Sequence, residues 1–230
     1  MFTAAEELVA AGCTLIQYRN KSGNARAMLE QARELRRRFP QSQNRHFCQN
    51  RGEVGHPTLE KVESQNPHPN PAKGAALGWV TQVSGSHNPV RLIMNDRADL
   101  CLAAEFDGVH VGQEDLSPES VRRIIGPRRW LGVSTHNPEQ IREADLTSAD
   151  YLAIGPVFPT SSKERPDPVV GLEGVRRARQ LTRKPLVAIG GITRANAASV
   201  IEAGADAVAV ISDLLREPRK SAEEFFQILG

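Results

Sequence analysis

The sequence has few of the features that mark secreted, membrane-spanning or nucleic-acid-binding proteins. Its 230 residues include three cysteines, an odd number too small for a disulfide framework, which favours a reduced, cytoplasmic compartment. No apolar stretch approaches the ~18 residues that a transmembrane helix needs. A net charge of +2, from 29 basic and 27 acidic residues, gives no general attraction for nucleic acid or for an anionic membrane. We therefore expect neither as a partner.

Short apolar runs recur along the chain and alternate with helical patterns. Most runs are continuously apolar, which is typical of strands covered on both faces. The helical patterns carry start signals, such as Ser117 before Pro118 and Asn137 before Pro138. The predicted strands are 14–18, 91–94, 108–111, 131–134, 151–154, 185–189 and 206–211. The predicted helices are 25–39, one starting at each of Ser117 and Asn137, Thr193–Gly204, and one near 221–229.

This alternation predicts a parallel α/β architecture in a single domain over residues 1–230. The number and short spacing of the units favour a TIM (β/α)₈ barrel over an open doubly wound sheet. Seven strands are counted instead of eight, because residues 1–12 already have the pattern of the helix that should follow a first strand. We expect that first strand to be missing or replaced. Residues 41–89 are polar and aperiodic, which predicts a disordered insertion, although the run 76–83 could pair as a strand.

Polar side chains follow the predicted strands, at the ends where barrel enzymes place their sites. After the first strand, Gln17, Arg19 and Lys21 alternate along the chain and so share one orientation. The two cations could hold an anion there, although a solvated strand end would explain the same residues.

Acidic residues follow the next two strands, as Asn95-Asp96 and as Asp115. Neighbouring strands would bring the two carboxylates close together, where one must take up a proton unless a cation separates their charges. Mg²⁺ is commonly held by one or two carboxylates together with substrate phosphate oxygens. The pair therefore predicts a magnesium site. An equally good interpretation is that Asp96 and Asp115 cap the helices that follow them.

Later strand ends carry hydroxyls and glycines. Ser134 places a hydroxyl at the end of its strand. The segment 155–163 joins glycine and proline kinks to three hydroxyls and Lys163, a composition that suits a mobile loop closing on phosphate. Gly190-Gly191 and Ile211-Ser212 end the last two strands, where barrels often bind phosphate through backbone N–H groups. The strand ends together predict a diphosphate site with a metal and a separate monophosphate site.

The chain resembles the thiamine-phosphate synthase family in a series of motifs, which in chain order are QYRNK, MNDRADL, GVHVGQEDL, LGVSTHN, AIGPVFPTSSK, VAIGGI and ADAVAVIS. The resemblance covers roughly residues 1–40 and 90–230. It implies a TIM-barrel transferase that joins 4-amino-2-methyl-5-hydroxymethylpyrimidine diphosphate to a thiazole phosphate, giving thiamine monophosphate and pyrophosphate. It also implies Mg²⁺ as cofactor, two small phosphorylated substrates, and a dissociative, carbocation-like step.

The resemblance assigns roles to the residues at the strand ends. It implies that Asp96 and Asp115 ligate Mg²⁺, and that Ser134 and Lys163 contact the diphosphate or the pyrimidine during catalysis. The implied ligands of the pyrimidine diphosphate are Gln17, Arg19, Lys21 and Asn95. Those of the thiazole phosphate are Thr160, Ser162, Gly191, Ile211 and Ser212, with Ser162 standing where the family often has threonine.

Two other functions fit parts of the same pattern. A thiazole tautomerase on a related barrel would keep the thiazole-phosphate site and would need neither the carboxylate pair nor the diphosphate cations. The joint presence of Asn95, Asp96, Asp115, Arg19 and Lys163 argues against it. A non-catalytic protein that binds a phosphate ligand is the second alternative, because a barrel without its first strand exposes two strand edges.

Overall fold

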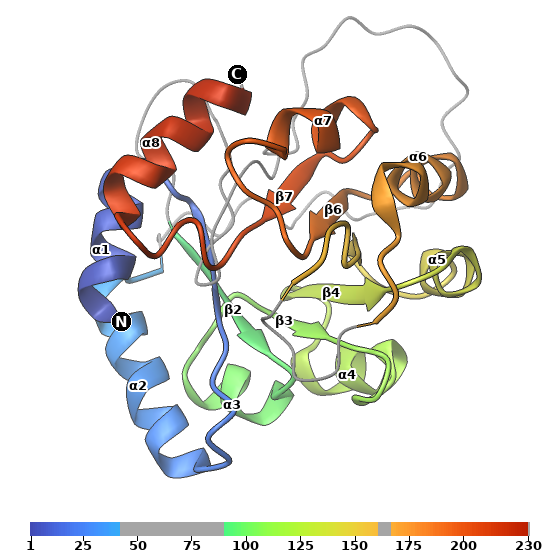
Figure 1. Ribbon diagram of the computed structural model, residues 1–230. Coiled ribbons are helices and arrows are strands. Elements are labelled where there is room, and N and C mark those ends of the chain that lie inside the picture. The colour runs from blue at the N-terminus through green and yellow to red at the C-terminus, as the bar shows by residue number, and fades with distance from the viewer. Residues whose placement is uncertain (42–89, 161–166, 230) are drawn as a thin grey trace, which may run out of the picture.

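The computed structural model describes residues 1–41, 90–160 and 167–229. In this part of the chain, seven parallel strands form one curved sheet in which each strand pairs with the next along the chain (Figure 1). The predicted parallel barrel and all of its seven strands are therefore confirmed. The strands are β1 (Leu15–Tyr18), β2 (Arg91–Asn95), β3 (Gly108–Val111), β4 (Trp130–Thr135), β5 (Tyr151–Ile154), β6 (Leu186–Ile189) and β7 (Ala207–Ala209).

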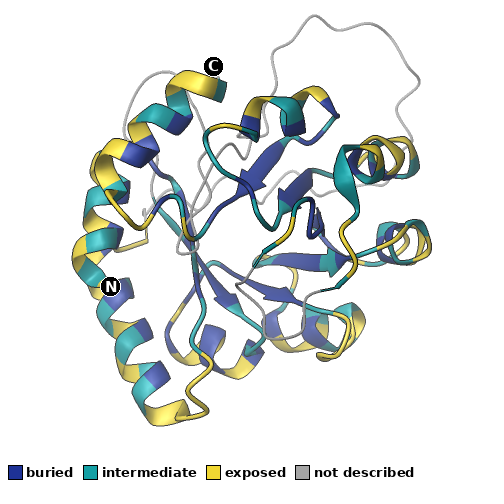
Figure 2. Cartoon of the chain, viewed as in Figure 1, coloured by how far each residue is buried: buried dark blue, intermediate teal, exposed yellow. Residues whose placement is uncertain are grey.

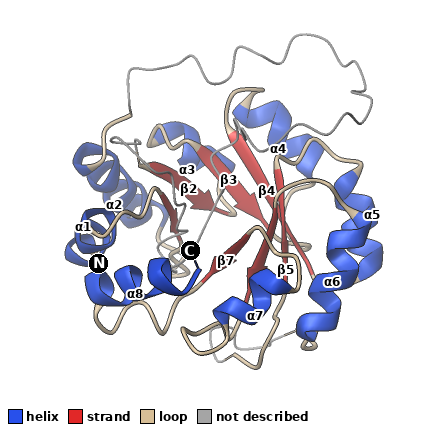
Figure 3. Ribbon diagram, turned by 90° about the horizontal axis from the view of Figure 1, so that it is seen from above, coloured by secondary structure: helices blue, strands red, loops and turns tan. Residues whose placement is uncertain are grey.

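The helices lie on the outside of the curved sheet (Figure 3). They are α1 (Phe2–Ala10), α2 (Ala25–Arg38), α3 (Ala98–Ala103), α4 (Pro118–Ile125), α5 (Pro138–Asp145), α6 (Gly171–Leu181), α7 (Ala197–Glu202) and α8 (Pro218–Leu229).

Local capping sets the start of several helices, as the sequence predicts. The Ser117 hydroxyl accepts from the backbone N–H of Ser120, and the Asn137 side chain accepts from that of Gln140. The prediction for α7 is wrong by four residues, because α7 begins at Ala197 and not at Thr193. The Asn196 side chain accepts the Thr193 N–H at 2.8 Å, which holds residues 193–196 in a turn before the helix.

The two ends of the sheet, β1 and β7, are its unpaired edges within the described residues. Helices α1 and α8 pack against each other on this side of the barrel (Figure 1). The predicted insertion at 41–89, with its strand at 76–83, lies outside the described residues except for Gln41. The Gln41 side chain donates to the backbone oxygen of Glu105 at 2.8 Å.

The core has two layers, one between the sheet and the helices and one inside the barrel. Figure 2 shows the strands as almost entirely buried and the outer faces of the helices as exposed. Inside the barrel, Gly132 makes room for a large side chain, since a Cβ there would lie 2.0 Å from the Tyr151 ring. At the amino ends of the strands, the Arg91 guanidinium lies 4.9 Å from the centroid of the Trp130 ring. Leu15, Ile93, Tyr151, Ala153, Val187, Ala207 and Ala209 fill the inner layer.

One ion pair recurs three times at the amino ends of the strands. In each copy an arginine from an even-numbered helix pairs with the aspartate just before an odd-numbered strand. The same carboxylate oxygen accepts a backbone N–H from the strand between them, so one aspartate fastens a helix to two strands. The three copies are Arg36–Asp107 at 2.6 Å with the N–H of Leu92, Arg122–Asp150 at 2.7 Å with that of Leu131, and Arg179–Asp206 at 2.7 Å with that of Leu186.

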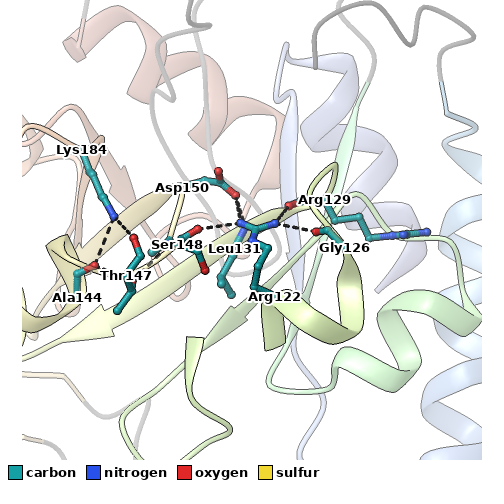
Figure 4. Close-up of polar contacts among 10 residues, drawn as sticks. Arg122, Gly126, Arg129, Leu131, Ala144, Thr147, Ser148, Asp150 and Lys184 are labelled. Atoms are coloured by element: carbon teal, nitrogen blue, oxygen red, sulfur yellow. Dashed lines mark hydrogen bonds and ion pairs between the residues drawn. The ribbon is translucent and has the colours of Figure 1, made fainter. Parts of the chain in front are cut away.

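Figure 4 shows the central copy of this ion pair. The Arg122 guanidinium donates to the backbone oxygens of Gly126, Arg129 and Ser148 as well as to Asp150. It thus satisfies carbonyls that the loops after α4 and after α5 leave without helical partners. The Arg122 and Asp150 side chains are 15% and 13% exposed, so solvent screens the pair only weakly.

We expect the Asp150→Asn variant to lower the free energy of unfolding by about 2 kcal/mol, because a mostly buried arginine loses its charged partner. Urea denaturation would measure the loss. The matched control is Glu139→Gln, which removes a carboxylate whose pair with Arg142 is more than half exposed on both sides. The control should change stability by less than about 0.5 kcal/mol. Equal effects of the two changes would contradict this account.

Candidate active site

The carboxyl ends of the parallel strands meet at one edge of the barrel, and the predicted site residues lie there. Ile16 pairs with Leu92 and Gln17 with Ile93 in the sheet register, which sets the end of β1 beside the end of β2. The Gln17 side chain donates from Nε2 to Oδ1 of Asn95 at 3.1 Å. The structure thus brings together two residues that are 78 positions apart in the sequence.

Asp96 and Asp115 lie next to each other at this edge. The charge of Asp115 and hydrogen bonding between the two carboxyl groups both help to raise the pKa of Asp96. Burial is the larger cause, followed by the charge of Asp115, and together they raise the pKa of Asp96 to about 6. Without a cation beside it, Asp96 therefore holds a proton more tightly than an ordinary aspartate does.

The backbone around both aspartates is fixed by hydrogen bonds. Asp96 has a left-handed φ of 62°, a conformation that is uncommon outside glycine and is often found at functional sites. Its N–H donates to the His110 oxygen of β3 at 2.8 Å, so the turn stays attached to the sheet. The Asp115 carboxylate accepts the N–H of Gly112 at 2.7 Å, which places it at the end of β3.

The capping interpretation of the two aspartates is not supported. Within residues 90–160, the N-cap of α3 is Arg97, without a side-chain cap, and the N-cap of α4 is Ser117, whose own hydroxyl supplies the bond. Asp96 and Asp115 turn toward each other instead. Two adjacent carboxylates offer the hard oxygen ligands that suit Mg²⁺.

Cations lie within electrostatic reach of the carboxylate pair. The charges of Lys21 and Arg19 lower the pKa of Asp96 and so partly offset burial and the charge of Asp115. These two cations follow β1, on the same side of the barrel. A search of the described residues finds no cluster of three or more His, Cys, Asp or Glu side chains that could hold a metal ion. A metal at the Asp96–Asp115 pair would need oxygen atoms from water or from a ligand to complete its coordination.

The hydroxyl of Ser134 belongs to a buried hydrogen-bonded chain inside the barrel. The His110 ring contacts the Ser134 hydroxyl through Nε2 at 2.8 Å and the Tyr151 hydroxyl through Nδ1 at 3.0 Å. Gln113 donates to the Ser134 backbone oxygen at 2.6 Å. Sequence reasoning missed His110 and Tyr151. The available signal was a histidine inside the apolar run GVHV, whose position between Val109 and Val111 turns it toward the opposite face of the strand.

Burial keeps His110 neutral. Loss of solvation lowers the pKa of His110 to about 4, although the charge of Asp115 opposes the shift. A neutral imidazole has one N–H and one bare nitrogen, so it can donate to one hydroxyl and accept from the other. His110 can thus link the Tyr151 and Ser134 hydroxyls in either tautomer, donating to one and accepting from the other.

The low pKa of His110 predicts a loss of stability in acid. The unfolded chain binds a proton at this residue near pH 6.5, whereas the folded chain does so only near pH 4, so the free energy of unfolding falls as the pH drops through this window. The full contribution is about 3 kcal/mol. Urea midpoints measured between pH 7 and pH 4 should fall more steeply for the native chain than for His110→Gln. Parallel curves for the two proteins would refute the assignment.

A second group of predicted residues lies across the edge, at the ends of β5, β6 and β7. Gly190 and Gly191 have left-handed φ values of 94° and 66°. A Cβ on Gly191 would lie 2.5 Å from the Pro159 oxygen, so only glycine fits this approach of two loops. The Phe158 N–H donates to the Gly190 oxygen at 3.0 Å, which joins the loop that carries Thr160 to the glycine pair.

The remaining predicted residues extend this second group. Ile189 pairs with Ala209 in the sheet, so the loops that start at Gly190 and at Val210 leave the barrel side by side. Ile211 is half-buried and Ser212 is exposed at the end of β7. Ser162 and Lys163 lie outside the described residues. The described site residues thus form a carboxylate and cation group at β1–β4 and a glycine and hydroxyl group at β5–β7.

A parallel barrel with paired carboxylates, cations and a glycine loop at the carboxyl edge defines a class of protein that is suited to binding phosphorylated ligands. Comparison with known proteins identifies the family within this class. The sequence model of the thiamine monophosphate synthase family matches residues 79–214, which is more than half of the chain. The chain belongs to this family, as its motifs predict.

Individual relatives agree with this assignment. The chain is 51% identical over 225 residues to a thiamine-phosphate synthase of Koribacter versatilis, covering 98% of this chain and 84% of the relative. It is 38% identical over 207 residues to one from Chloroflexus aurantiacus, covering 90% of this chain and 74% of the relative. The solved structure of thiamine phosphate pyrophosphorylase from Pyrococcus furiosus superimposes with a TM-score of 0.69 at 29% identity, over 99% of this chain and 88% of that one.

Within the described residues, no helix has the length and apolar character needed to cross a membrane.

Proposed function

We propose that this chain is a magnesium-dependent thiamine-phosphate synthase that joins the pyrimidine diphosphate to the thiazole phosphate and releases pyrophosphate. The observation that carries the proposal is the Asp96–Asp115 pair, whose carboxyl groups lie in contact at the end of β2 and β3 with Lys21 and Arg19 nearby. The carboxylates suit the metal ion, and the two cations suit the diphosphate oxygens. The family membership of the chain supports the same activity.

The diphosphate would bind at the β1–β4 group. Asp96 and Asp115 would hold Mg²⁺, which supplies positive charge to the leaving pyrophosphate when it is bound. Arg19 and Lys21 would contact the diphosphate oxygens, with Lys163 as a third cation from the loop after β5. The bond from Gln17 to Asn95 Oδ1 leaves the amide nitrogen of Asn95 to donate to the pyrimidine diphosphate.

The monophosphate of the thiazole would bind at the β5–β7 group. Gly191 has no side chain, and a Cβ there would meet the Pro159 oxygen, so this turn offers an anion only backbone groups. Thr160, Ser162 and Ser212 would add hydroxyl donors, and Ile211 would flank the ring. Two phosphorylated substrates would then face each other across the mouth of the barrel.

The reaction follows from these two positions. The bond between the pyrimidine methylene and the diphosphate oxygen breaks first, and its electron pair leaves with pyrophosphate. The thiazole nitrogen then supplies the pair that forms the new carbon–nitrogen bond. Stabilisation of the charge on the leaving group is therefore the main task of the protein, and no protein nucleophile is needed. Ser134, oriented by neutral His110, would contact the diphosphate or the pyrimidine, and a closed site would keep water from capturing the cation.

Removal of either carboxylate tests the proposal directly. We expect Asp96→Asn and Asp115→Asn each to reduce magnesium-dependent pyrophosphate release by about 100-fold or more, because the metal loses a charged ligand. The assay mixes purified chain, Mg²⁺ and both substrates and follows pyrophosphate. Asp99→Asn is the matched control, since that exposed carboxylate on α3 pairs with Arg97 and should be dispensable.

The outcomes distinguish the alternative functions. Pyrophosphate release that survives both substitutions would refute the metal assignment. A native chain that binds thiazole phosphate but releases no pyrophosphate would instead be the non-catalytic binding protein. Isomerisation of a thiazole phosphate without use of the pyrimidine diphosphate would indicate the tautomerase.

The buried chain of hydrogen bonds gives a further test. Tyr151→Phe removes the hydroxyl that contacts His110, so we expect kcat to fall about 5- to 10-fold, equivalent to roughly 1 kcal/mol for one hydrogen bond. Thr147→Val is the control, because the Thr147 hydroxyl donates to the Ala144 oxygen before β5, at the opposite end of the barrel. Steady-state kinetics should show no change in kcat for the control. Unchanged kcat in both variants would exclude a role for the Tyr151–His110–Ser134 chain.

A further inference from the structure

Arg194 joins the two loops that carry the β5–β7 group. It lies in the loop after β6, three residues beyond Gly191, and its partner Asp213 directly follows Ser212 in the loop after β7. The guanidinium donates from Nε to Asp213 Oδ2 at 3.0 Å and from Nη2 to Oδ1 at 3.1 Å. The backbone N–H of Arg194 also donates to Asp213 Oδ2, at 2.9 Å. Three hydrogen bonds therefore fix the distance between the loops.

The same arginine reaches a third element. Its Nη1 donates to a carboxylate oxygen of Glu224 on α8, so all three guanidinium nitrogens are engaged with carboxylates. The side chains of Arg194, Asp213 and Glu224 are 28%, 17% and 38% exposed. A bidentate, partly shielded network of this kind is more strongly held than an isolated surface ion pair.

The turn at Gly191 is also held from its other side. Asn196 donates from Nδ2 to the Gly191 oxygen at 3.1 Å and accepts the Thr193 N–H at 2.8 Å. The glycine turn is thus anchored by Asn196 within its own loop and by Arg194 to the neighbouring loop. Ser212 is held near this turn because the adjacent Asp213 is bound to Arg194.

We propose that Arg194 and Asp213 are positioning residues that set the spacing between Gly191 and Ser212 and thereby the affinity of the monophosphate site. This inference rests on the proposed function for the identity of the ligand, thiazole phosphate. Arg194 lies near the expected phosphate, but its guanidinium is already bound to two carboxylates, those of Asp213 and Glu224. A phosphate held by donors from two loops binds tightly only when their spacing is fixed before binding, because ordering the loops would otherwise reduce the affinity.

Kinetics of Arg194→Gln, Asp213→Asn and the double variant test this role. Each single change should raise KM for thiazole phosphate about tenfold, because the loops lose their preset spacing. KM for the pyrimidine diphosphate should stay within about twofold, since that substrate binds at the β1–β4 group. The double variant should be no worse than the weaker-binding single variant, because either change opens the same link.

The matched control is Arg219→Gln. Arg219 lies on α8 and pairs with Glu223 at 3.0 Å, with side chains 63% and 48% exposed. This variant makes the same chemical change on α8, the helix that carries Glu224, and leaves the loops after β6 and β7 unaltered. It should leave both KM values and kcat unchanged.

Several results would overturn the inference. A higher KM in Arg194→Gln with an unchanged KM in Asp213→Asn would show that Arg194 is a direct phosphate ligand. An unchanged KM in both variants would show that the link does not control the site. A uniform loss of kcat with both KM values unchanged, together with a lower thermal midpoint, would show a role in stability alone.

Failure of the proposed function would be visible separately. If the native chain releases no pyrophosphate, the Kd for thiazole phosphate measured by titration calorimetry replaces KM. Weaker binding by Arg194→Gln and Asp213→Asn, with Arg219→Gln unaffected, would still support the positioning role. Equal binding by all of them, or no binding by the native chain, would refute it.

Discussion

The repulsion between Asp96 and Asp115 is the constraint around which the carboxyl edge of the barrel is built. Burial of the half-buried Asp96 and the charge of the nearby Asp115 raise the pKa of Asp96 to about 6. The fold tolerates this cost because hydrogen bonds to the sheet and to Gly112 fix both residues, even with a left-handed φ at Asp96. Lys21 and Arg19 offset part of the charge, and the Mg²⁺ of the proposed function would offset the rest.

The opposite end of the barrel has the reverse design. There, three aspartates each pair with an arginine and also accept a backbone N–H, while the arginines also donate to backbone oxygens. The charged groups and the backbone polar groups therefore find partners together. In parallel barrels the amino ends of the strands serve stability and the carboxyl ends serve function. Like charges brought together at one end are stable only in a fold that is held firmly elsewhere.

The interior of the barrel connects the two ends of this design. Gly132 leaves space for Tyr151, whose hydroxyl contacts His110, which in turn contacts Ser134 at the edge. A buried polar chain of this kind is stable only when each member has a partner, and burial keeps its histidine neutral. The geometry at the edge therefore depends on packing at the centre, and the loops after β6 and β7 depend likewise on Arg194.

The sequence by itself determined the strands, most helix starts and the strand-end residues, because apolar runs and caps such as Ser117 act over a few neighbouring positions. Motif order was enough to predict the family. The roles assigned to the site residues remain predictions, including those of Ser162 and Lys163, which lie outside the described residues. The predicted insertion at 41–89 also remains a prediction. Only the tertiary structure decided that Asp96 and Asp115 face each other and do not cap helices, that α7 starts at Ala197, and that His110 meets Tyr151. It also decided that Arg194 binds carboxylates. These contacts join residues from different strands and loops. Their distances are set by sheet register and loop packing, which no local sequence pattern encodes.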